Sequence, residues 1–387
     1  MQLNSLRFFI FLPLLKFSDI HGHTELKNNL VSVIRQGRIP HAQMIISREG
    51  NAALPLALAY AQYTSCLDKG EHDSCGVCSS CQKYKQLIHP DLHLSFPIFG
   101  STETCDDFIQ DFREAFLANP MLTLNDWLRS IDGENKRPNI NIRECRNIIR
   151  KLSLRPYESD YKVLIMWLPE YLGKEGNVLL KLLEEPPQNT LFLLVTENQD
   201  QILTTIISRT QFVKVPVYTY EEIDDYLSTH ALANADISRN VALMAEGNLS
   251  KAIKLAGEME NTQYDSFRLW LLDCYSGNLG KIIGEIDNYT DKGKEGLKMF
   301  LLYGIQMIRS ALLIQHQSLQ NKLTANEIEF VTKLSKLITL DNTQEIYEAM
   351  NQAIFEIDRN GSTKLILINL SLKLKYSLKP KGNLKTA

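Results

Sequence analysis

Four cysteines within sixteen residues carry the most specific chemistry in this sequence. They follow the spacing Cys66-x8-Cys75-x2-Cys78-x2-Cys81. Four thiolates at this spacing can close a tetrahedral Zn²⁺ site, and four sulfur ligands leave no open position, so such a metal would be structural. An iron–sulfur cluster and four unrelated thiols are the alternatives. The other three cysteines lack partners in the sequence and are expected to be small core residues: Cys105, Cys145 and Cys274.

The stretch from His41 to Ala61, "HAQMIISREGNAALPLALAYA", raises a second chemical question. An apolar run ends at a polar turn that holds one glycine, Gly50, and helical spacing follows. This order of strand, loop and helix is typical of a phosphate-binding loop. The residues that would hold a phosphate are missing from it. From these residues alone, a nucleotide site, the remnant of one and an ordinary turn all stay open.

A third candidate is basic. Arg143, Arg146, Arg150 and Lys151 lie on one predicted helix over residues 140–154. They could contact a DNA phosphate backbone. Glu144 interrupts the run, so a solvated helix face explains the pattern at least as well.

These residues need elements to position them, and the first 215 residues or so predict alternating strands and helices. Continuous apolar runs are typical of strands that are buried on both faces of a parallel sheet. An α/β domain with a largely parallel sheet is therefore predicted. Residues 86–138 read as irregular, and after Pro216 the pattern becomes helical. The predicted strands are 43–46, 161–168, 190–198 and 211–217, and the predicted helices include 24–36, 52–65 and 140–154.

Composition narrows the class of protein. The chain has 387 residues, of which 44% are hydrophobic and 22% charged, as in an ordinary globular protein. A net charge of −3 excludes a protein that coats nucleic acid by bulk charge. The apolar run 6–15 resembles the core of a signal peptide, but it is too short to span a bilayer and no cleavage site follows. No other run reads as a membrane span, so a cytoplasmic protein without a membrane partner is predicted.

The order of motifs resembles the bacterial clamp-loader subunits of DNA polymerase III, a branch of the AAA+ ATPases. The resemblance covers about residues 17–257, and beyond them only helical character remains, as expected for a collar domain. Besides the cysteine spacing, it rests on "FSDIHGHTELKNNL" (17–30), "GRIPHA" (37–42), "LLKLLEEPPQNTLFLLVTEN" (179–198) and "ISRT" (207–210).

The phosphate loop of this family, G-x-x-x-x-G-K-[ST], is degenerate here. Ser47 and Ala52 replace its two glycines, which let backbone amides wrap the phosphates. Ala53 replaces the lysine that neutralises phosphate charge, and Leu54 replaces the hydroxyl that holds Mg²⁺.

The second half of the family's ATP site is also missing. Trp167 and Leu168 stand where the family has an Asp-Glu pair that holds Mg²⁺ and orients water. Glu170 follows two residues later and is expected to be a surface turn residue. Two halves lost together predict a chain that neither binds nor hydrolyses ATP.

Arg209 in "ISRT" is the residue through which the resemblance implies a catalytic role. The family's Ser-Arg-Cys arginine completes the ATP site of a neighbouring subunit, because a guanidinium stabilises charge on the γ-phosphate. The alternative is an arginine that caps a helix or pairs with a carboxylate. Thr210 replaces the cysteine of that motif. Thr196, at a phosphate-sensing position, is expected to be structural, and Lys251, at a second sensing position, is expected on a solvated face.

The resulting prediction is an AAA+-type parallel-sheet core at 1–216 with an inserted zinc module at 66–81, a helical lid at 217–257 and an all-α collar at 258–387. The resemblance implies a non-hydrolysing, delta-prime-like subunit that braces the clamp loader and supplies Arg209 in trans. Other clamp-loader subunits, the sliding clamp and primer–template DNA would be its partners, and structural Zn²⁺ its cofactor. The alternatives are an active gamma/tau-type ATPase, an AAA+-fold adaptor outside the replisome, and an unrelated zinc-ribbon nucleic-acid binder.

Overall fold

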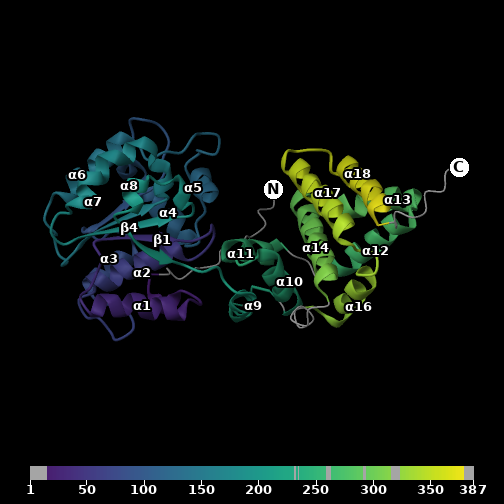
Figure 1. The fold of residues 1–387 in the computed structure, drawn as a ribbon, viewed down its shortest axis with the longest axis horizontal. Helices are drawn as coiled ribbons and strands as arrows, with labels where there is room; N and C mark the ends of the chain where they lie inside the picture. The colour runs from purple at the N-terminus through teal and green to yellow at the C-terminus, as the bar shows by residue number, and fades with distance from the viewer. Residues whose placement is uncertain are drawn as a thin grey trace, which may run out of the picture. The chain divides into compact units, whose positions relative to one another are not determined.

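A computed structural model describes residues 15–230, 232–233, 235–258, 263–290, 293–314 and 323–378. The chain forms two compact units (Figure 1). The first runs to Tyr218 and also includes 248–250, and the second holds Thr219–Gly247 and the chain from Lys251 onward. The second unit thus contains residues of both the predicted lid and the predicted collar, and the three-domain division stays a prediction.

A five-stranded parallel sheet organises the first unit. Its strand order is β2-β3-β4-β1-β5, and each neighbouring pair is parallel. The predicted parallel α/β architecture of this part of the chain is confirmed. The strands are β1 (Ala42–Ile46), β2 (Leu92–Ser95), β3 (Lys162–Trp167), β4 (Thr190–Thr196) and β5 (Gln211–Lys214).

Helices cover both faces of this sheet (Figure 1). The predicted helices at 24–36, 52–65 and 140–154 are present as α1, α2 and α6, with ends that differ by a few residues. Asn141 caps α6 by accepting the Glu144 amide at 3.0 Å. The helices of this unit are α1 (Thr24–Arg35), α2 (Ala53–Ser65), α3 (Ser79–Lys85), α4 (Ile109–Ala118), α5 (Leu124–Ser130), α6 (Ile142–Leu152), α7 (Leu180–Glu184) and α8 (Thr204–Ile207), with 3-10 segments at Phe17–Asp19, Cys105–Phe108, Pro169–Leu179 and Gln199–Gln201.

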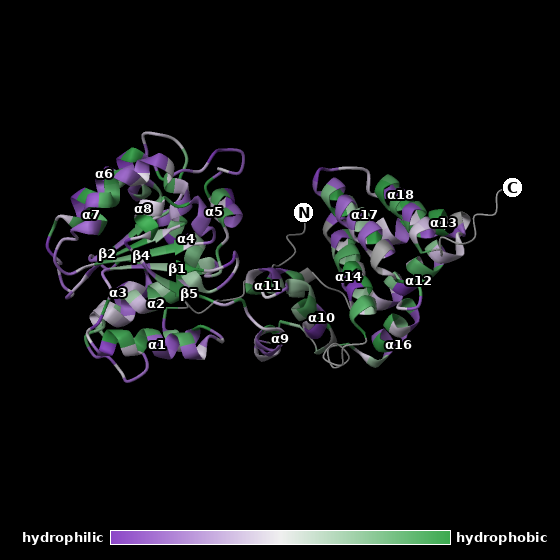
Figure 2. Cartoon of the chain, viewed as in Figure 1, coloured by the Kyte–Doolittle hydropathy of each residue, from purple (hydrophilic) through white to green (hydrophobic). Residues whose placement is uncertain are grey.

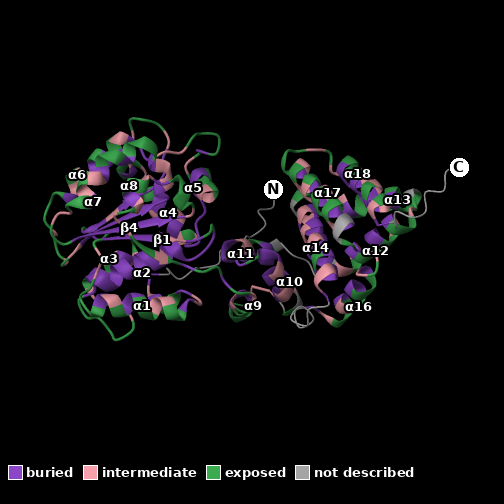
Figure 3. Ribbon diagram, viewed as in Figure 1, coloured by how far each residue is buried: buried purple, intermediate pink, exposed green. Residues whose placement is uncertain are grey.

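The central strands form the core, as their apolar runs predict (Figures 2 and 3). Every residue of β3 and β4 is buried. The expectation that β5 is also a buried strand is wrong. Three of its four residues are exposed, including Phe212 at 45%. β5 lies at one edge of the sheet, but β2 at the other edge is mostly buried, so edge position alone does not account for the exposure of β5.

The expectation that 86–138 is irregular is also wrong. The segment supplies β2, α4 and α5, and β2 extends the sheet beyond β3. Phe96 stacks on Phe112 at 4.1 Å between ring centroids, and Trp127 meets both rings edge-on. The hydrophobic periodicity of this segment does not predict these elements, because each of them spans too few residues to show a repeat.

The second unit is helical throughout its described residues. α14 is long and apolar enough over Gly296–Leu313 to cross a membrane by length and composition, which corrects the expectation that no such run exists. Within the unit 61% of that window is buried, as in a core helix. Its helices are α9 (Tyr220–Thr229), α10 (Ala235–Ala245), α11 (Leu249–Glu258), α12 (Gln263–Ser276), α13 (Leu279–Thr290), α14 (Gly293–Leu313), α16 (Ala325–Leu334), α17 (Leu340–Asp358) and α18 (Thr363–Ser377).

The signal-like run at 6–15 lies outside the described residues except for Leu15, which is buried. The end of the chain from residue 379 also lies outside them.

Candidate metal centre and degenerate nucleotide site

The four clustered cysteines meet in space. Cys66 follows α2, Cys78 caps α3 and Cys81 lies in its first turn. All four Sγ atoms lie within 4.8 Å of one another. The Sγ atoms of Cys66 and Cys75 are 3.6 Å apart, and those of Cys75 and Cys81 are 3.9 Å apart. Tetrahedral bonds of about 2.3 Å to zinc would place sulfurs about 3.8 Å apart, so the cluster can hold a metal ion of this kind.

Three of these sulfurs accept backbone hydrogen bonds, although burial raises the pKa of the Cys66 and Cys81 thiols. The amides of Cys75, Cys78 and Cys81 donate to the Sγ of Cys66, Cys75 and Cys78 at 3.3–3.5 Å. Burial raises the pKa of Cys78, but the amides of Cys81 and Leu67 outweigh it and lower that pKa to about 6. Gly76 has a φ of +74°, so the turn between Cys75 and Cys78 uses a conformation that glycine adopts without strain.

The remaining cysteines are buried in the core, as predicted: Cys105, Cys145 and Cys274. Burial raises the pKa of Cys145 and of Cys274 to about 12, so both stay as thiols.

The degenerate phosphate loop connects β1 to α2 and is in contact with residues 248–250. Gly50 has a φ of +72°, and its carbonyl accepts the Ser250 amide at 3.1 Å. A Cβ placed on Gly50 would lie 2.2 Å from the Oδ1 of Asn248. Ala53 and Leu54, at the lysine and hydroxyl positions, are both buried. The loop therefore offers no cationic side chain at these positions, and Asn248 packs against its glycine.

Carboxylates gather beside this loop at the carboxyl edge of the sheet. Glu170 accepts from the Thr196 hydroxyl at 2.8 Å and from the Glu197 amide at 3.0 Å. Burial, together with the negative charges of Glu49 and Glu170, raises the pKa of Glu197 to about 8. Burial also raises the pKa of Glu170. With a pKa of about 8, Glu197 is largely protonated near neutral pH, and this edge offers acidic groups where a functional site supplies positive charge.

This geometry settles two expectations from the sequence. Glu170 is not a plain surface turn residue, because its carboxylate binds the end of β4. Thr196 is fully buried and donates to Glu170, in keeping with a structural role. At the end of β3, Trp167 and Leu168 are buried, and Leu168 has a φ of +56°. Neither can hold a metal ion.

Arg209 lies at the opposite edge of the sheet from the degenerate loop. It precedes β5, whose first residue Gln211 pairs with Gln43 near the start of β1. The loop instead follows the end of β1. Arg209 forms an ion pair with Glu184, and its guanidinium donates to the Thr205 carbonyl at 2.7 Å. Its side chain is 32% exposed. A guanidinium at this edge is turned away from its own chain's loop and partly open to another molecule.

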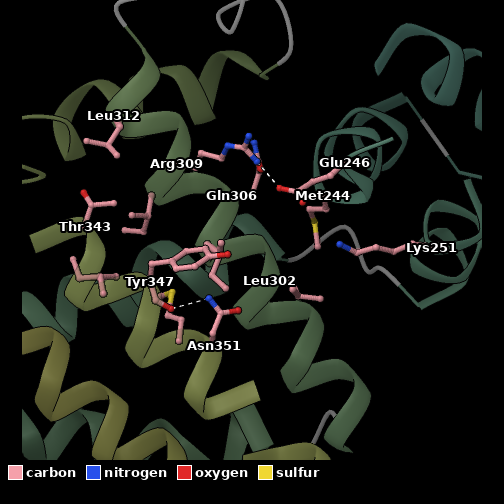
Figure 4. A pocket seen from close by; sticks show the side chains of 14 residues that line it. Met244, Glu246, Lys251, Leu302, Gln306, Arg309, Leu312, Thr343, Tyr347 and Asn351 are labelled. Carbon is pink, nitrogen blue, oxygen red and sulfur yellow. Dashed lines mark hydrogen bonds and ion pairs between the residues drawn. The ribbon is translucent and has the colours of Figure 1, made fainter. Parts of the chain in front are cut away.

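Lys251 does not lie on a solvated face, which corrects the sequence expectation. It lines a cavity of about 470 Å³ in the second unit, together with Glu246 and Arg309 (Figure 4). Burial lowers the pKa of Lys251. Lys251 reaches this cavity because the turn after α10 packs near α14. The local sequence does not indicate this packing.

The basic residues of α6 are largely engaged within the chain. Lys151 pairs with Asp106, Arg150 donates to Asn147 at 2.8 Å, and Arg143 donates to a backbone carbonyl at 3.1 Å. Of these contacts, only the Lys151–Asp106 pair offsets a charge, and Arg146 is exposed, so contact of α6 with a phosphate backbone stays a prediction.

Sequence reasoning missed Glu197 and Asn248. Both had a local signal, since Glu197 is an acidic residue near the end of the predicted strand 190–198 and Asn248 lies in the helix break "EGN". Their meeting with Gly50 and Glu170 depends on tertiary structure.

Comparison with known proteins places this site in a family. A model of the family "DNA polymerase III, delta subunit" matches residues 22–219, just over half of the chain. The DNA polymerase III subunit gamma of Buchnera aphidicola is 25% identical over 246 residues, which cover 62% of this chain and 57% of that protein. The delta' subunit of Bacillus subtilis is 26% identical over 249 residues, which cover 64% of this chain and 62% of that protein.

The match thus spans less than two thirds of these relatives. A gamma subunit-related protein of Thermotoga maritima has 16% sequence identity and a TM-score of 0.36, over 90% of this chain and 99% of that chain. A TM-score this low does not establish a common fold. The family match over residues 22–219 does establish kinship, and by it the chain belongs to the DNA polymerase III delta subunit family, a family of clamp-loader subunits.

Proposed function

We propose that this chain is a non-hydrolysing, delta-prime-like subunit of the clamp loader, built on an AAA+-type core. The observation that carries the proposal is the degenerate loop: Ala53 and Leu54 replace the phosphate-binding residues, and Asn248 packs against Gly50. The carboxylates of Glu170 and Glu197 stand beside it. Loss of the binding residues, the close contact at Gly50 and acidic groups in place of positive charge all argue against bound ATP.

In this role Arg209 acts on a neighbouring subunit. Its position at the amino edge of the sheet supports action in trans, because its own loop lies at the other edge. The ion pair with Glu184 would have to open, and a γ-phosphate would replace the carboxylate as the partner. Glu184 then holds the guanidinium in place until the neighbour docks.

The cysteine module would hold one structural Zn²⁺ through Cys66, Cys75, Cys78 and Cys81. The mutual Sγ spacing and the amide donors support this assignment. Four sulfur ligands complete the coordination shell, so the ion would stabilise the link between α2 and α3 and take no part in catalysis.

The proposed assembly gives the chain its partners. Other clamp-loader subunits would contact it directly, with the collar residues 258–387 as the oligomerisation domain and 217–257 as the lid. The sliding clamp and primer–template DNA would be reached through the complex in the cytoplasm. Names of relatives support this only at the level of DNA polymerase III subunits.

The test of the finger role is the ATPase activity of the reconstituted clamp loader. Arg209→Ala should lower DNA-stimulated ATP hydrolysis by about tenfold or more while the complex still assembles. Glu184→Gln should keep the activity, because it frees the guanidinium. Arg38→Ala, at an exposed arginine of the same unit, serves as the control. Unchanged hydrolysis in Arg209→Ala would refute the finger.

A second candidate function is an active gamma/tau-type ATPase, favoured by the match to a gamma subunit. It predicts that the isolated chain binds ATP with Mg²⁺. Titration calorimetry should show no binding, and measurable affinity would support this candidate over the proposal. An adaptor outside the replisome is the third. Pull-downs that recover no clamp-loader subunit would favour it.

A further inference from the structure

A buried carboxylate lies at the centre of the second unit. Glu327, in the first turn of α16, is only 2% exposed. One of its oxygens, Oε2, accepts from both the amide and the hydroxyl of Thr324 at 2.9 Å, which forms a capping box at the start of α16. The other oxygen, Oε1, faces away from its own helix.

That second oxygen joins two other helices. Oε1 accepts from the hydroxyl of Tyr303 on α14 at 2.7 Å and from Nδ2 of Asn240 on α10 at 3.0 Å. Asn240 and Tyr303 are buried, at 8% and 1% exposure. One side chain thus fixes a point on α10 against α14 and α16, although 87 residues separate Glu327 from Asn240.

Another polar contact joins α10 to the preceding helix, α9. Ser238 lies two residues before Asn240 on α10. It is fully buried and donates to the carbonyl of Asp224 on α9 at 3.2 Å. Its hydroxyl also bonds the Asp224 carboxylate. Two separate sets of hydrogen bonds therefore hold α10: Ser238 joins it to Asp224 on α9, and Asn240 joins it to Glu327 on α16.

A second polar contact lies farther along these two helices. Six residues beyond Asn240 along the chain, Glu246 forms an exposed ion pair with Arg309, which is six residues beyond Tyr303 (Figure 4). Between the two contacts lies the cavity of about 470 Å³, lined by Met244 and Gln306 among others. Exposed ion pairs contribute little, whereas the hydrogen bond between Asn240 and Glu327 is buried and adds to the packing of the buried apolar residues of α10.

A buried charge tolerates few alternatives. Removing a charged acceptor leaves its buried donors without a partner, which costs more than an ordinary hydrogen bond. A satisfied polar network of this kind favours one arrangement of the helices around it, whereas apolar contacts permit sliding.

We propose that Glu327 is a positioning residue that holds α9 and α10 on the helical bundle, so that the segment 220–245 follows the bundle. The consequence for the clamp loader rests on the proposed function. There the lid would move together with the collar and would not respond to nucleotide. The two buried hydrogen bonds to Oε1 of Glu327, the separate bond between Ser238 and Asp224, and the adjacent cavity carry this assignment.

Hydrogen exchange of the full chain tests it, with the amides of α10 (Ala235–Ala245) as the readout. Glu327→Gln should speed their exchange by about tenfold or more, since one or two buried hydrogen bonds are lost. Amides of the central strands should not change. Glu329→Gln is the matched control, because Glu329 lies on the same helix but is exposed and paired with Lys333.

A rescue separates positioning from general loss of stability. In Glu327→Gln combined with Asn240→Asp, an amide can donate to a carboxylate and restore the link with reversed polarity, so α10 should regain most of its protection. Unchanged exchange in Glu327→Gln, or equal acceleration in α10 and α13 without rescue, would overturn the proposal. The isolated chain needs no partner for this measurement, so its outcome is independent of the ATPase test.

Discussion

Replacing Gly50 with alanine tests whether Asn248 packs against the degenerate loop. Gly50 adopts a φ of +72°, and its carbonyl is bonded to the Ser250 amide. An added Cβ would lie 2.2 Å from Oδ1 and 2.7 Å from Cγ of Asn248. These distances are too short for any side chain, so either Asn248 or the loop must move.

The expected loss has two parts. The left-handed backbone costs an alanine about 1 kcal/mol relative to glycine. Displacing Asn248 from a close contact adds about 1–3 kcal/mol, as overpacking typically does. Gly37→Ala supplies the comparison, because Gly37 has a φ of +65° and an added Cβ there meets nothing within 4 Å. It should show only the first part.

Urea unfolding of the two variants measures the difference. Gly50→Ala should lower the free energy of unfolding by about 1–3 kcal/mol more than Gly37→Ala does. Combining Gly50→Ala with Asn248→Gly should recover most of that excess, because the obstructing side chain is gone. If Gly50→Ala lowered the free energy of unfolding no more than Gly37→Ala does, then Asn248 would not pack against the loop and the reasoning would be refuted.

Two further predictions concern metal and pH. Metal analysis should find about one Zn²⁺ per chain. Cys78→Ser should abolish this and lower the thermal midpoint, whereas Cys274→Ser should keep the metal; zinc retained in Cys78→Ser would exclude the four-cysteine site. Glu197 has a folded pKa of about 8, above its unfolded value, so its protonated form favours folding and this contribution is lost as pH rises toward 8. Glu197→Gln should therefore gain roughly 2 kcal/mol over the parent chain at pH 9, after allowance for partial exposure, and nothing at pH 4; an equal gain at both values would contradict the shift.

Local sequence was enough for much of the sheet. β3 and β4 were predictable because a strand buried on both faces needs an unbroken apolar run. β2 was not predictable, because a strand of only four residues is too short to show a hydrophobic period. The exposure of β5 could not be predicted from its apolar residues, because it depends on which elements cover the strand in the folded unit.

The candidate sites divide in the same way. The cysteine ligand set and the absent phosphate-binding residues could be predicted from short-range order, since spacing along the chain limits which groups can share a turn. The acidic surroundings of the loop could not, because Glu49, Glu170 and Glu197 follow three different strands. They meet only because parallel strands end at one edge of the sheet.

By itself, then, the sequence determined which chemistry is possible here: four sulfurs for a metal, no side chains for a phosphate, and one arginine in a recognisable motif. Tertiary structure alone decided that Asn248 packs on Gly50, that Arg209 faces away from its own loop and pairs with Glu184, and that Glu327 joins three helices. The physical reason is separation along the chain. These partners lie tens to hundreds of residues apart, and only the packing of complete helices and strands brings them within bonding distance.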